Sequence, residues 1–212
     1  MGNFKNWDIA FGYAKDCISG KRVANKYRIK ACKRFLDDYE SGRYDFDPKD
    51  AEFVIRIIEN TICHKKGENR EGIPLRGTPF FLMDFHKFII YNLLGFYMKG
   101  TRIRRFQECL IFIPRKNVKT SFAGALAYAL GILYRMSGTT IYIVAAALQQ
   151  ALETFDFVNY NIKHMGEWDE DGGHFHIINN NNEHSIKAEI GGGAIDLNAL
   201  AANPDAQDSL NC

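Results

Sequence analysis

The stretch that decides the fold is IFIPRKNVKT, residues 111–120, where an apolar run meets a basic turn. Residues 108–113 are largely apolar without alternation, which is typical of a strand covered on both faces of a parallel sheet. After Lys119, apolar residues recur at helical spacing, at Phe122, Leu126, Leu130 and Leu133. The sequence therefore predicts a strand, a tight turn and a helix that begins at Lys119 and Thr120.

The start of this predicted helix is suited to binding a triphosphate. The first backbone N–H groups of a helix have no intrahelical acceptor, and together with the positive end of the helix dipole they favour phosphate oxygens. Lys119 would reach the outer phosphates of ATP, and Thr120 would ligate the Mg²⁺ held by the nucleotide. The usual motif G-x-x-x-x-G-K-[ST] is not satisfied, because Ile113 and Val118 occupy its glycine positions. A basic turn that binds no ligand is therefore the alternative.

The string Pro114-Arg115-Lys116-Asn117-x-Lys119-Thr120 resembles the variant phosphate loop of tailed-phage terminase large subunits, the ATPases that pump DNA into capsids. In that family the loop commonly reads Arg-Lys-Asn-Gly-Lys-Ser/Thr. The similarity continues along the chain in family order. Residues 82–90 (LMDFHKFII) resemble the helical lead-in, residues 141–146 (IYIVAA) the second strand, and residues 202–206 (ANPDA) the approach to the acidic strand.

This resemblance implies an α/β fold with the parallel-sheet core of a P-loop NTPase of the RecA-like, ASCE class. The core would be incomplete and preceded by a helical N-terminal segment. Residues 1–75 would form that segment and residues 76–212 a partial ATPase domain, with a linker at residues 67–77. ATP hydrolysis would be coupled to translocation of double-stranded DNA into a capsid. Other partners would be the terminase small subunit, the portal protein and further copies of the motor, in the cytoplasm of a bacterial host, with no membrane partner.

The resemblance also assigns roles to the loop. The phosphates would be wrapped by Pro114, Arg115, Lys116, Asn117, Val118, Lys119 and Thr120. Of these, Lys119 and Arg115 would be catalytic, since a guanidinium at the γ-phosphate stabilises the charge that moves during phosphoryl transfer. In the family an aromatic-Gln pair lies beside the adenine, and Phe85-His86 stands at that place. His86 could replace the Gln, although a core histidine is the commoner explanation.

An acidic pair that such an ATPase needs is missing from the sequence. Its Asp would hold magnesium and its Glu would orient water, at the end of a short apolar strand. The strand expected at residues 141–146 ends without an acid, Asp196 lies inside an alternating run, and Asp84 precedes the phosphate loop. By resemblance the acidic strand would begin after Cys212, and these residues alone would be inactive.

Two other classes of function stay open. One is a non-catalytic nucleotide-binding or scaffold module, which the two substituted glycines and the missing acidic pair favour. The other is a different DNA-directed P-loop ATPase, such as a helicase-like or chromosome-partition protein. Val118 bears on both, because a β-branched residue with positive φ would be strained by about 1–3 kcal/mol and the loop would bind poorly.

Composition limits the remaining possibilities. Lys and Arg number 27 against 25 Asp and Glu, a formal net charge of +2, so the overall field would not drive nucleic-acid binding. A local DNA contact is expected at residues 102–105 (RIRR), unless these form a solvated turn. The five cysteines form no C-x-x-C pair, which favours reduced thiols, and no run of eighteen apolar residues predicts a membrane span.

Several further elements follow from periodicity. One helix would bury a stripe of Val23, Tyr27, Ala31, Phe35 and Tyr39. The next would be capped by Asp47 and bury Ala51, Val54, Ile55, Ile58 and Ile62. A nearly all-apolar helix would cover residues 80–97, and another would run from Gln149 to Val158, with Gln149 or Gln150 as a possible sensor of nucleotide or DNA.

The C-terminal part predicts a β-hairpin, residues 174–179 against 183–190, followed by a strand at residues 194–201. His174, His176 and His184 could together mimic a metal site. The hairpin with exposed polar side chains is the simpler interpretation, because no carboxylate or cysteine has ligand spacing around these histidines.

Overall fold

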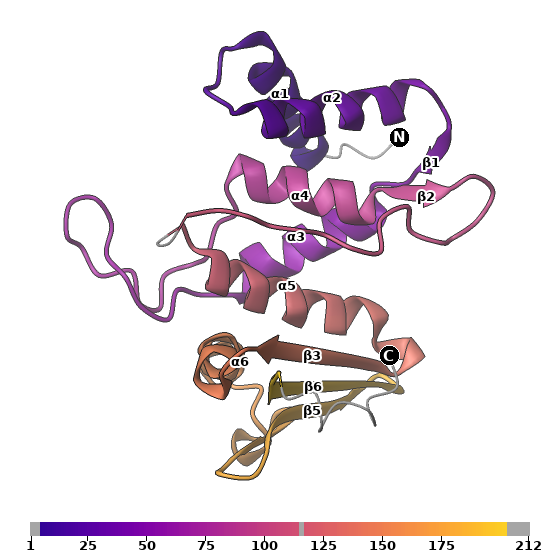
Figure 1. Ribbon diagram of the computed structural model, residues 1–212. Coiled ribbons are helices and arrows are strands. Elements are labelled where there is room, and N and C mark those ends of the chain that lie inside the picture. The colour runs from indigo at the N-terminus through magenta and orange to yellow at the C-terminus, as the bar shows by residue number, and fades with distance from the viewer. Residues whose placement is uncertain (1–4, 115–116, 203–212) are drawn as a thin grey trace. The chain divides into compact units, whose positions relative to one another are not determined.

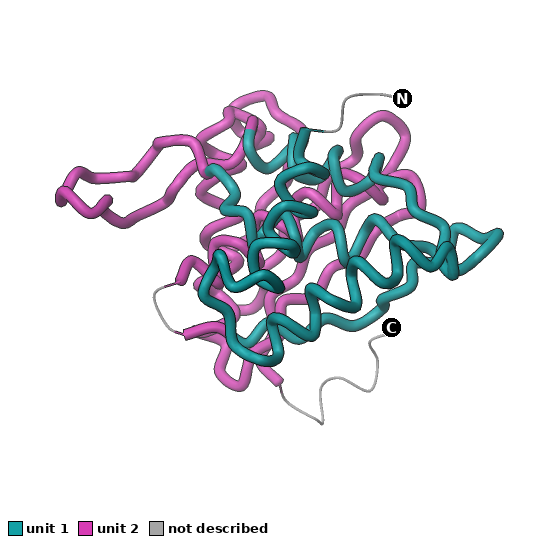
Figure 2. Tube along the Cα trace, turned by 90° about the horizontal axis from the view of Figure 1, so that it is seen from above, with its two compact units in different colours: residues 1–59, 81–112 teal, residues 60–80, 113–212 magenta. Residues whose placement is uncertain are grey.

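The computed structural model describes residues 5–114 and 117–202. It divides into two compact units that are interleaved in sequence (Figure 2). Unit 1 comprises Met1–Glu59 and Phe81–Phe112, and unit 2 comprises Asn60–Phe80 and Ile113–Cys212. The chain passes between the two units three times.

Unit 1 consists of helices and a small two-stranded sheet (Figure 1). Strand β1 pairs antiparallel with β2, and Phe46 lies opposite Phe96. The helix predicted after Asp47 is confirmed, because Asp47 Oδ1 accepts the Lys49 N–H at 3.1 Å and the predicted apolar stripe is buried. The elements are α1 (Lys5–Ser19), α2 (Lys26–Glu40), β1 (Tyr44–Phe46), α3 (Lys49–Thr61), α4 (Asp84–Leu94) and β2 (Phe96–Met98).

Two predictions about unit 1 need correction. Val23 and Tyr27 do not belong to a buried stripe, since α2 begins only at Lys26, where Asn25 Oδ1 accepts the Arg28 N–H at 2.9 Å. The buried face of α2 is instead formed by Cys32, Phe35 and Asp38. The apolar helix predicted at residues 80–97 is shorter, because the chain before Asp84 is extended and the residues after the α4 C-cap, Gly95, pair as β2.

Aromatic side chains fill the interior of unit 1. The indole ring of Trp7 on α1 lies between 4.4 and 5.5 Å from the ring centres of five neighbours drawn from α1, α2, β1 and α4. Such aromatic pairs contribute more than their buried area alone. The neighbours are Phe11, Phe35, Tyr39, Phe46 and Tyr91.

Unit 2 contains a mixed sheet of four strands in the order β3-β6-β5-β4. Strands β3 and β6 are parallel, and the other two pairs are antiparallel. The strand, helix, hairpin and final strand predicted in this region are all confirmed. The elements are α5 (Lys119–Tyr134), η1 (Arg135–Ser137), β3 (Thr139–Ala145), α6 (Leu148–His164), η2 (Asp169–Asp171), β4 (Phe175–Asn179), β5 (His184–Ile190) and β6 (Gly193–Ala201).

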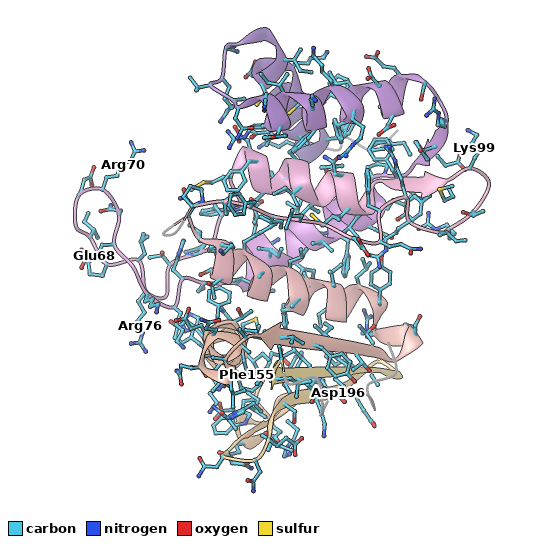
Figure 3. All side chains as sticks on the ribbon, viewed as in Figure 1. Glu68, Arg70, Arg76, Lys99, Phe155 and Asp196 are labelled. Carbon is cyan, nitrogen blue, oxygen red and sulfur yellow. The ribbon has the colours of Figure 1, made fainter. Side chains whose placement is uncertain are left out.

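Helices α5 and α6 pack on one face of this sheet. Along β6, Ile195, Leu197 and Ala199 are buried and alternate with less buried residues such as Asp196, as expected for a strand with one covered face. Phe155 of α6 is fully buried in the same core (Figure 3). The sheet face that α5 and α6 cover is therefore buried. The alternating run predicted for this strand is confirmed.

The strand predicted at residues 108–113 is wrong for the described structure. In the described part of the chain no strand pairs with this segment, and Leu110 and Phe112 are 91% and 94% exposed. An apolar run forms a strand only where neighbouring strands supply hydrogen bonds and covering side chains. The fold is therefore α/β with a small mixed sheet, and the described sheet is not a parallel core built around this segment. None of the helices in the described ranges is long and apolar enough to cross a membrane.

Candidate phosphate-binding site

The N-terminus of α5 has an unusual backbone. Val118 is the N-cap residue, and its φ of 57° and ψ of 17° place it in the left-handed region. Among residues 5–114 and 117–202 it is the one non-glycine residue with positive φ. The Phe122 N–H donates to the Val118 carbonyl oxygen at 2.9 Å, so the helical hydrogen bonds begin directly from this strained residue.

A β-branched residue with this conformation is an outlier, and such strain costs about 1–3 kcal/mol. Strained backbone persists where the surrounding structure imposes it, and it gathers at binding sites. Valine has no polar side chain and therefore cannot cap the first N–H groups of α5. The helix start thus keeps its capacity to donate hydrogen bonds to an anion.

An open pocket of about 520 Å³ lies at this helix start. Its volume is within the range of roughly 300–1,000 Å³ that small-molecule sites occupy. The pocket combines the turn before α5, the first turn of α5 and the first turns of α6. It is lined by Pro114, Val118, Lys119, Thr120, Ser121, Gln150 and Glu153.

The close approach of α5 and α6 involves Gly124. A Cβ atom at Gly124 would lie 2.8 Å from Cδ1 of Phe157, closer than a side chain tolerates. The missing side chain therefore lets α6 pack tightly against α5. Gln150 and Glu153 are three residues apart on α6, so they share one helix face and line the same pocket.

Sequence analysis found part of this site and missed part of it. The sequence predicts Pro114, Val118, Lys119 and Thr120 at the site and offers Gln150 as a sensor, and all five line the pocket. The sequence analysis does not include Glu153. Its position three residues after Gln150 predicts that the two side chains share one helix face. Among the described lining residues, Lys119 is the one cation and Glu153 the one carboxylate, so the pocket is not strongly charged by its side chains.

The remaining residues of the predicted loop are described only in part. Asn117 Nδ2 donates to the Pro114 carbonyl oxygen at 3.3 Å. Arg115 and Lys116 lie outside the described residues. The roles given to them by resemblance therefore stay predictions.

His86 lies in unit 1 and is 1% exposed. Its Nδ1 accepts the Met83 N–H at 3.3 Å, so the ring forms part of the cap of α4. Burial lowers its pKa to about 4, so the imidazole is neutral at pH 7. These contacts are those of a core histidine, the alternative considered from the sequence, and a contact with an adenine ring stays a prediction.

Each of the three histidines of the hairpin region contacts a different polar side chain. The Nδ1 atoms of His174 and His176 lie 2.9 and 2.6 Å from carboxylate oxygens of Glu167 and Asp169. His184 Nδ1 lies 2.7 Å from the side-chain oxygen of Asn179. No group of three or more potential metal ligands occurs in the described ranges. The interpretation as a hairpin with exposed polar side chains is confirmed.

Comparisons of the chain with protein-family models, with curated proteins and with solved structures give no match. The resemblance to terminase large subunits therefore stays a prediction from the sequence.

Proposed function

We propose that this chain is the ATP-binding part of a terminase-type viral DNA-packaging ATPase with a P-loop core. The observation that carries the proposal is the left-handed backbone of Val118 immediately before Lys119 and Thr120. The usual phosphate-loop motif has glycine at this position, and an obligatory glycine commonly marks a backbone that needs positive φ. Here valine takes the conformation that glycine adopts without strain. The strain at Val118 should weaken ATP binding relative to a loop with glycine at this position, as the sequence predicts for a positive φ.

The residues at the α5 N-terminus fit a bound triphosphate with Mg²⁺. The Lys119 ammonium would pair with the outer phosphates, the Thr120 hydroxyl would ligate Mg²⁺, and the first N–H groups of α5 would donate to phosphate oxygens. The turn from Pro114 to Thr120 would surround the phosphates, with Arg115 stabilising the charge of the γ-phosphate. When bound, ATP would supply the phosphoryl group and Mg²⁺ would neutralise part of the phosphate charge.

In this proposal ATP hydrolysis drives translocation of double-stranded DNA into a capsid. The terminase small subunit, the portal protein and further copies of the ATPase would be its partners, in the cytoplasm of a bacterial host. This part of the proposal is supported by the similarity of the loop and of the segments around it, in family order.

The test is calorimetry with a non-hydrolysable ATP analogue and Mg²⁺. We expect the wild type to bind, Lys119→Ala to lose at least tenfold in affinity, equivalent to about 1.4 kcal/mol, and Lys66→Ala to bind normally. Lys66 is a matched control because it is also exposed and does not line the pocket. Equal affinities for Lys119→Ala and the wild type would refute the assignment.

A second variant addresses the metal. Thr120→Ala should bind the analogue as well as the wild type in EDTA but gain less affinity when Mg²⁺ is added, because the hydroxyl ligand is missing. An unchanged response to Mg²⁺ would remove Thr120 from the metal site.

A non-catalytic nucleotide-binding module is the second candidate. Glu153 is the one carboxylate among the described pocket residues. Hydrolysis needs one acid to hold magnesium and another to orient water, so a single carboxylate favours this candidate. Phosphate-release measurements on the same protein test the catalytic candidate. Release that Lys119→Ala abolishes would support the ATPase and refute the module, whereas binding without release is expected of both candidates, because these residues lack the acidic pair.

A further inference from the structure

Helix α2 presents a row of basic side chains to solvent. Lys26, Lys30, Lys33 and Arg34 are all exposed, and their spacing of four, three and one residues keeps them near one side of the helix. From Lys26 to Arg34 the helix rises by about 12 Å. We call this row, together with the pocket described next, the α2 basic face.

A pocket of about 420 Å³ lies beside the C-terminal half of this row. Five of its lining residues are cations and two are carboxylates, so the lining carries three more positive than negative charges. The cations come from α2, from the approach to β1 and from the segment after β2. The charged lining residues are Lys30, Lys33, Arg34, Arg43, Arg105, Asp37 and Asp38.

Two guanidinium groups share one aromatic ring at the edge of this pocket. The Cζ atoms of Arg34 and Arg105 lie 4.7 and 4.5 Å from the ring centre of Phe106. Arg105 is also 4.1 Å from the ring centre of Tyr44. Burial, and secondly the positive charge of Arg34, lower the pKa of Arg105. Positive charges are thus held close together.

The carboxylates of the pocket do not balance these cations. Asp38 is largely buried and pairs with Arg105. The one remaining carboxylate of the lining, the exposed Asp37, stands against four further cations. In the described part of the chain, Lys30, Lys33, Arg34 and Arg43 form no ion pair. An anion entering the pocket would therefore meet several uncompensated charges.

Residues 102–105, the site first expected to contact DNA, differ in this respect. Arg102 lies 3.0 Å from Asp47 and 3.5 Å from Asp50, and Arg105 is paired with Asp38. The positive charges of Arg102 and Arg105 are thus paired with carboxylates within unit 1. The surplus positive charge lies on α2 instead.

We propose that the α2 basic face binds the phosphodiester backbone of a nucleic acid. The row is too long for a single phosphate, because about 12 Å corresponds to roughly three nucleotides at 3.4 Å per nucleotide. Binding is independent of base sequence, since contacts to phosphates carry no sequence information. The interaction does not depend on nucleotide binding at α5.

Fluorescence anisotropy with a short labelled duplex of mixed sequence tests this proposal, in EDTA and without nucleotide. The variant Lys30→Glu/Lys33→Glu is compared with Lys49→Glu/Lys66→Glu. Both pairs are exposed, and both double variants change the formal net charge from +2 to −2. Any difference between them therefore reflects position and not overall charge.

We expect the α2 variant to bind at least tenfold more weakly at low salt, while the control variant stays close to the wild type. The slope of log affinity against log salt concentration should fall by about 2, because each phosphate contact contributes about 0.9. Equal affinities for the two variants, or an equal loss in both, would overturn the proposal.

Two further measurements identify the ligand and the site. Polyglutamate should compete poorly with the labelled duplex. If it competes as strongly as unlabelled DNA, the proposal that the ligand is a phosphodiester backbone is overturned, and an acidic polypeptide is the ligand instead. Lys119→Ala should bind the duplex normally. If Lys119→Ala no longer binds the duplex, the DNA phosphates bind at α5 and the proposal for the α2 basic face fails. The ATP proposal is tested separately by calorimetry.

Discussion

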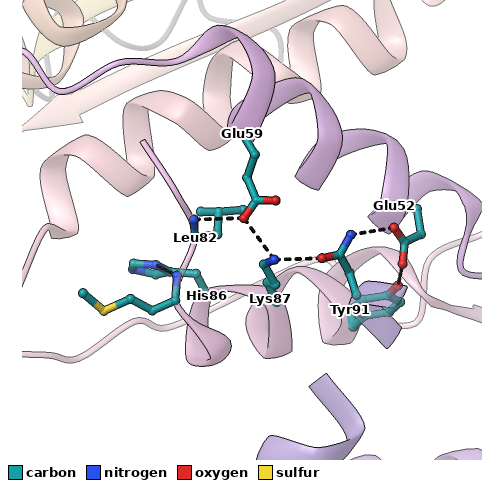
Figure 4. A network of polar contacts seen from close by, with 8 residues as sticks. Glu52, Glu59, Leu82, His86, Lys87 and Tyr91 are labelled. Carbon is teal, nitrogen blue, oxygen red and sulfur yellow. Dashed lines mark hydrogen bonds and ion pairs between the residues drawn. The ribbon is translucent and has the colours of Figure 1, made fainter. Parts of the chain in front are cut away.

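The ammonium of Lys87 lies 3.0 Å from Oε1 of Glu59, with the two side chains 9% and 21% exposed. Glu59 also accepts the Leu82 N–H at 3.1 Å, and Lys87 donates to Asn6 Oδ1 at 2.8 Å (Figure 4). This pair therefore connects α1, α3 and α4 inside unit 1.

The network continues from Asn6 to the aromatic interior. Asn6 Nδ2 donates to Glu52 Oε2 at 2.8 Å, and the Tyr91 hydroxyl donates to the other oxygen of Glu52 (Figure 4). Burial and the neighbouring Glu52 carboxylate raise the pKa of Tyr91, so the hydroxyl keeps its proton. The polar side chains of this network are thus paired with one another, as buried polar groups require.

Removing one partner of the Lys87–Glu59 pair should destabilise the protein strongly. We expect Glu59→Ala to lower the free energy of unfolding by about 3–5 kcal/mol, because it leaves a buried ammonium without its carboxylate. The double variant Glu59→Leu/Lys87→Met should recover much of this loss. Urea unfolding followed by circular dichroism measures both.

The control for this prediction is an exposed ion pair. Lys187 Nζ lies 3.2 Å from Glu183 Oε1, with both side chains more than two-fifths exposed. Lys187→Ala should therefore change stability by less than about 1 kcal/mol. A Glu59→Ala protein as stable as this control would show that the buried pair contributes little.

His86 should make stability depend on pH. Its folded-state pKa of about 4 lies below the ordinary value of 6.5, so between these pH values the unfolded chain binds more protons. Stability should therefore fall as pH is lowered from 6.5 to 4, by up to about 3 kcal/mol at 1.36 kcal/mol per pKa unit. His64, whose pKa is also lowered by burial, adds to the same trend.

The variant His86→Gln isolates this contribution. Glutamine can accept the Met83 N–H as the third helical residue of a capping box, and it does not titrate. Urea midpoints at pH 7 and pH 5 should differ less in His86→Gln than in the wild type. An identical pH dependence in the two proteins would mean that His86 titrates normally.

Val118→Gly should relieve strain at the start of α5. The gain of about 1–3 kcal/mol is partly offset by about 0.5–1 kcal/mol of unfolded-state entropy, so a net stabilisation of roughly 1 kcal/mol is expected. The affinity for the ATP analogue should rise, because the conformation with positive φ becomes easier to populate. Thermal unfolding and calorimetry measure the two effects.

Val118→Ala is the matched control, since alanine is still strained at positive φ although it is not β-branched. Its gain should be smaller than that of glycine. A glycine variant that is less stable than the wild type and binds no better would contradict the left-handed conformation at this position.

Glu153→Gln should strengthen binding of the ATP analogue in EDTA by a few fold. Its carboxylate lines the same pocket as Lys119 and would repel a triphosphate. Glu170→Gln, at an exposed position outside the pocket, is the control. Weaker binding of Glu153→Gln in Mg²⁺ would instead indicate that the carboxylate helps to hold the metal.

The sequence by itself determined those elements whose pattern is local. The stripe and cap of α3, the strand β3 with the helix after it, and the hairpin of β4 and β5 were all predicted, because side-chain periodicity directly reports which face of an element is buried. The basic turn with Lys119 and Thr120 was also located from the sequence, since its residues are adjacent in the chain.

Only the tertiary structure decided which elements meet. It left residues 108–113 unpaired although they have the composition of a strand, brought Glu153 to the pocket at α5, and paired Lys87 with Glu59. It also paired Arg102 with Asp47, whereas Lys30, Lys33 and Arg34 of α2 form no ion pair within the described ranges. The physical reason is that hydrogen bonding, burial and ion pairing depend on partners distant in the chain, which the pattern of a single segment does not specify.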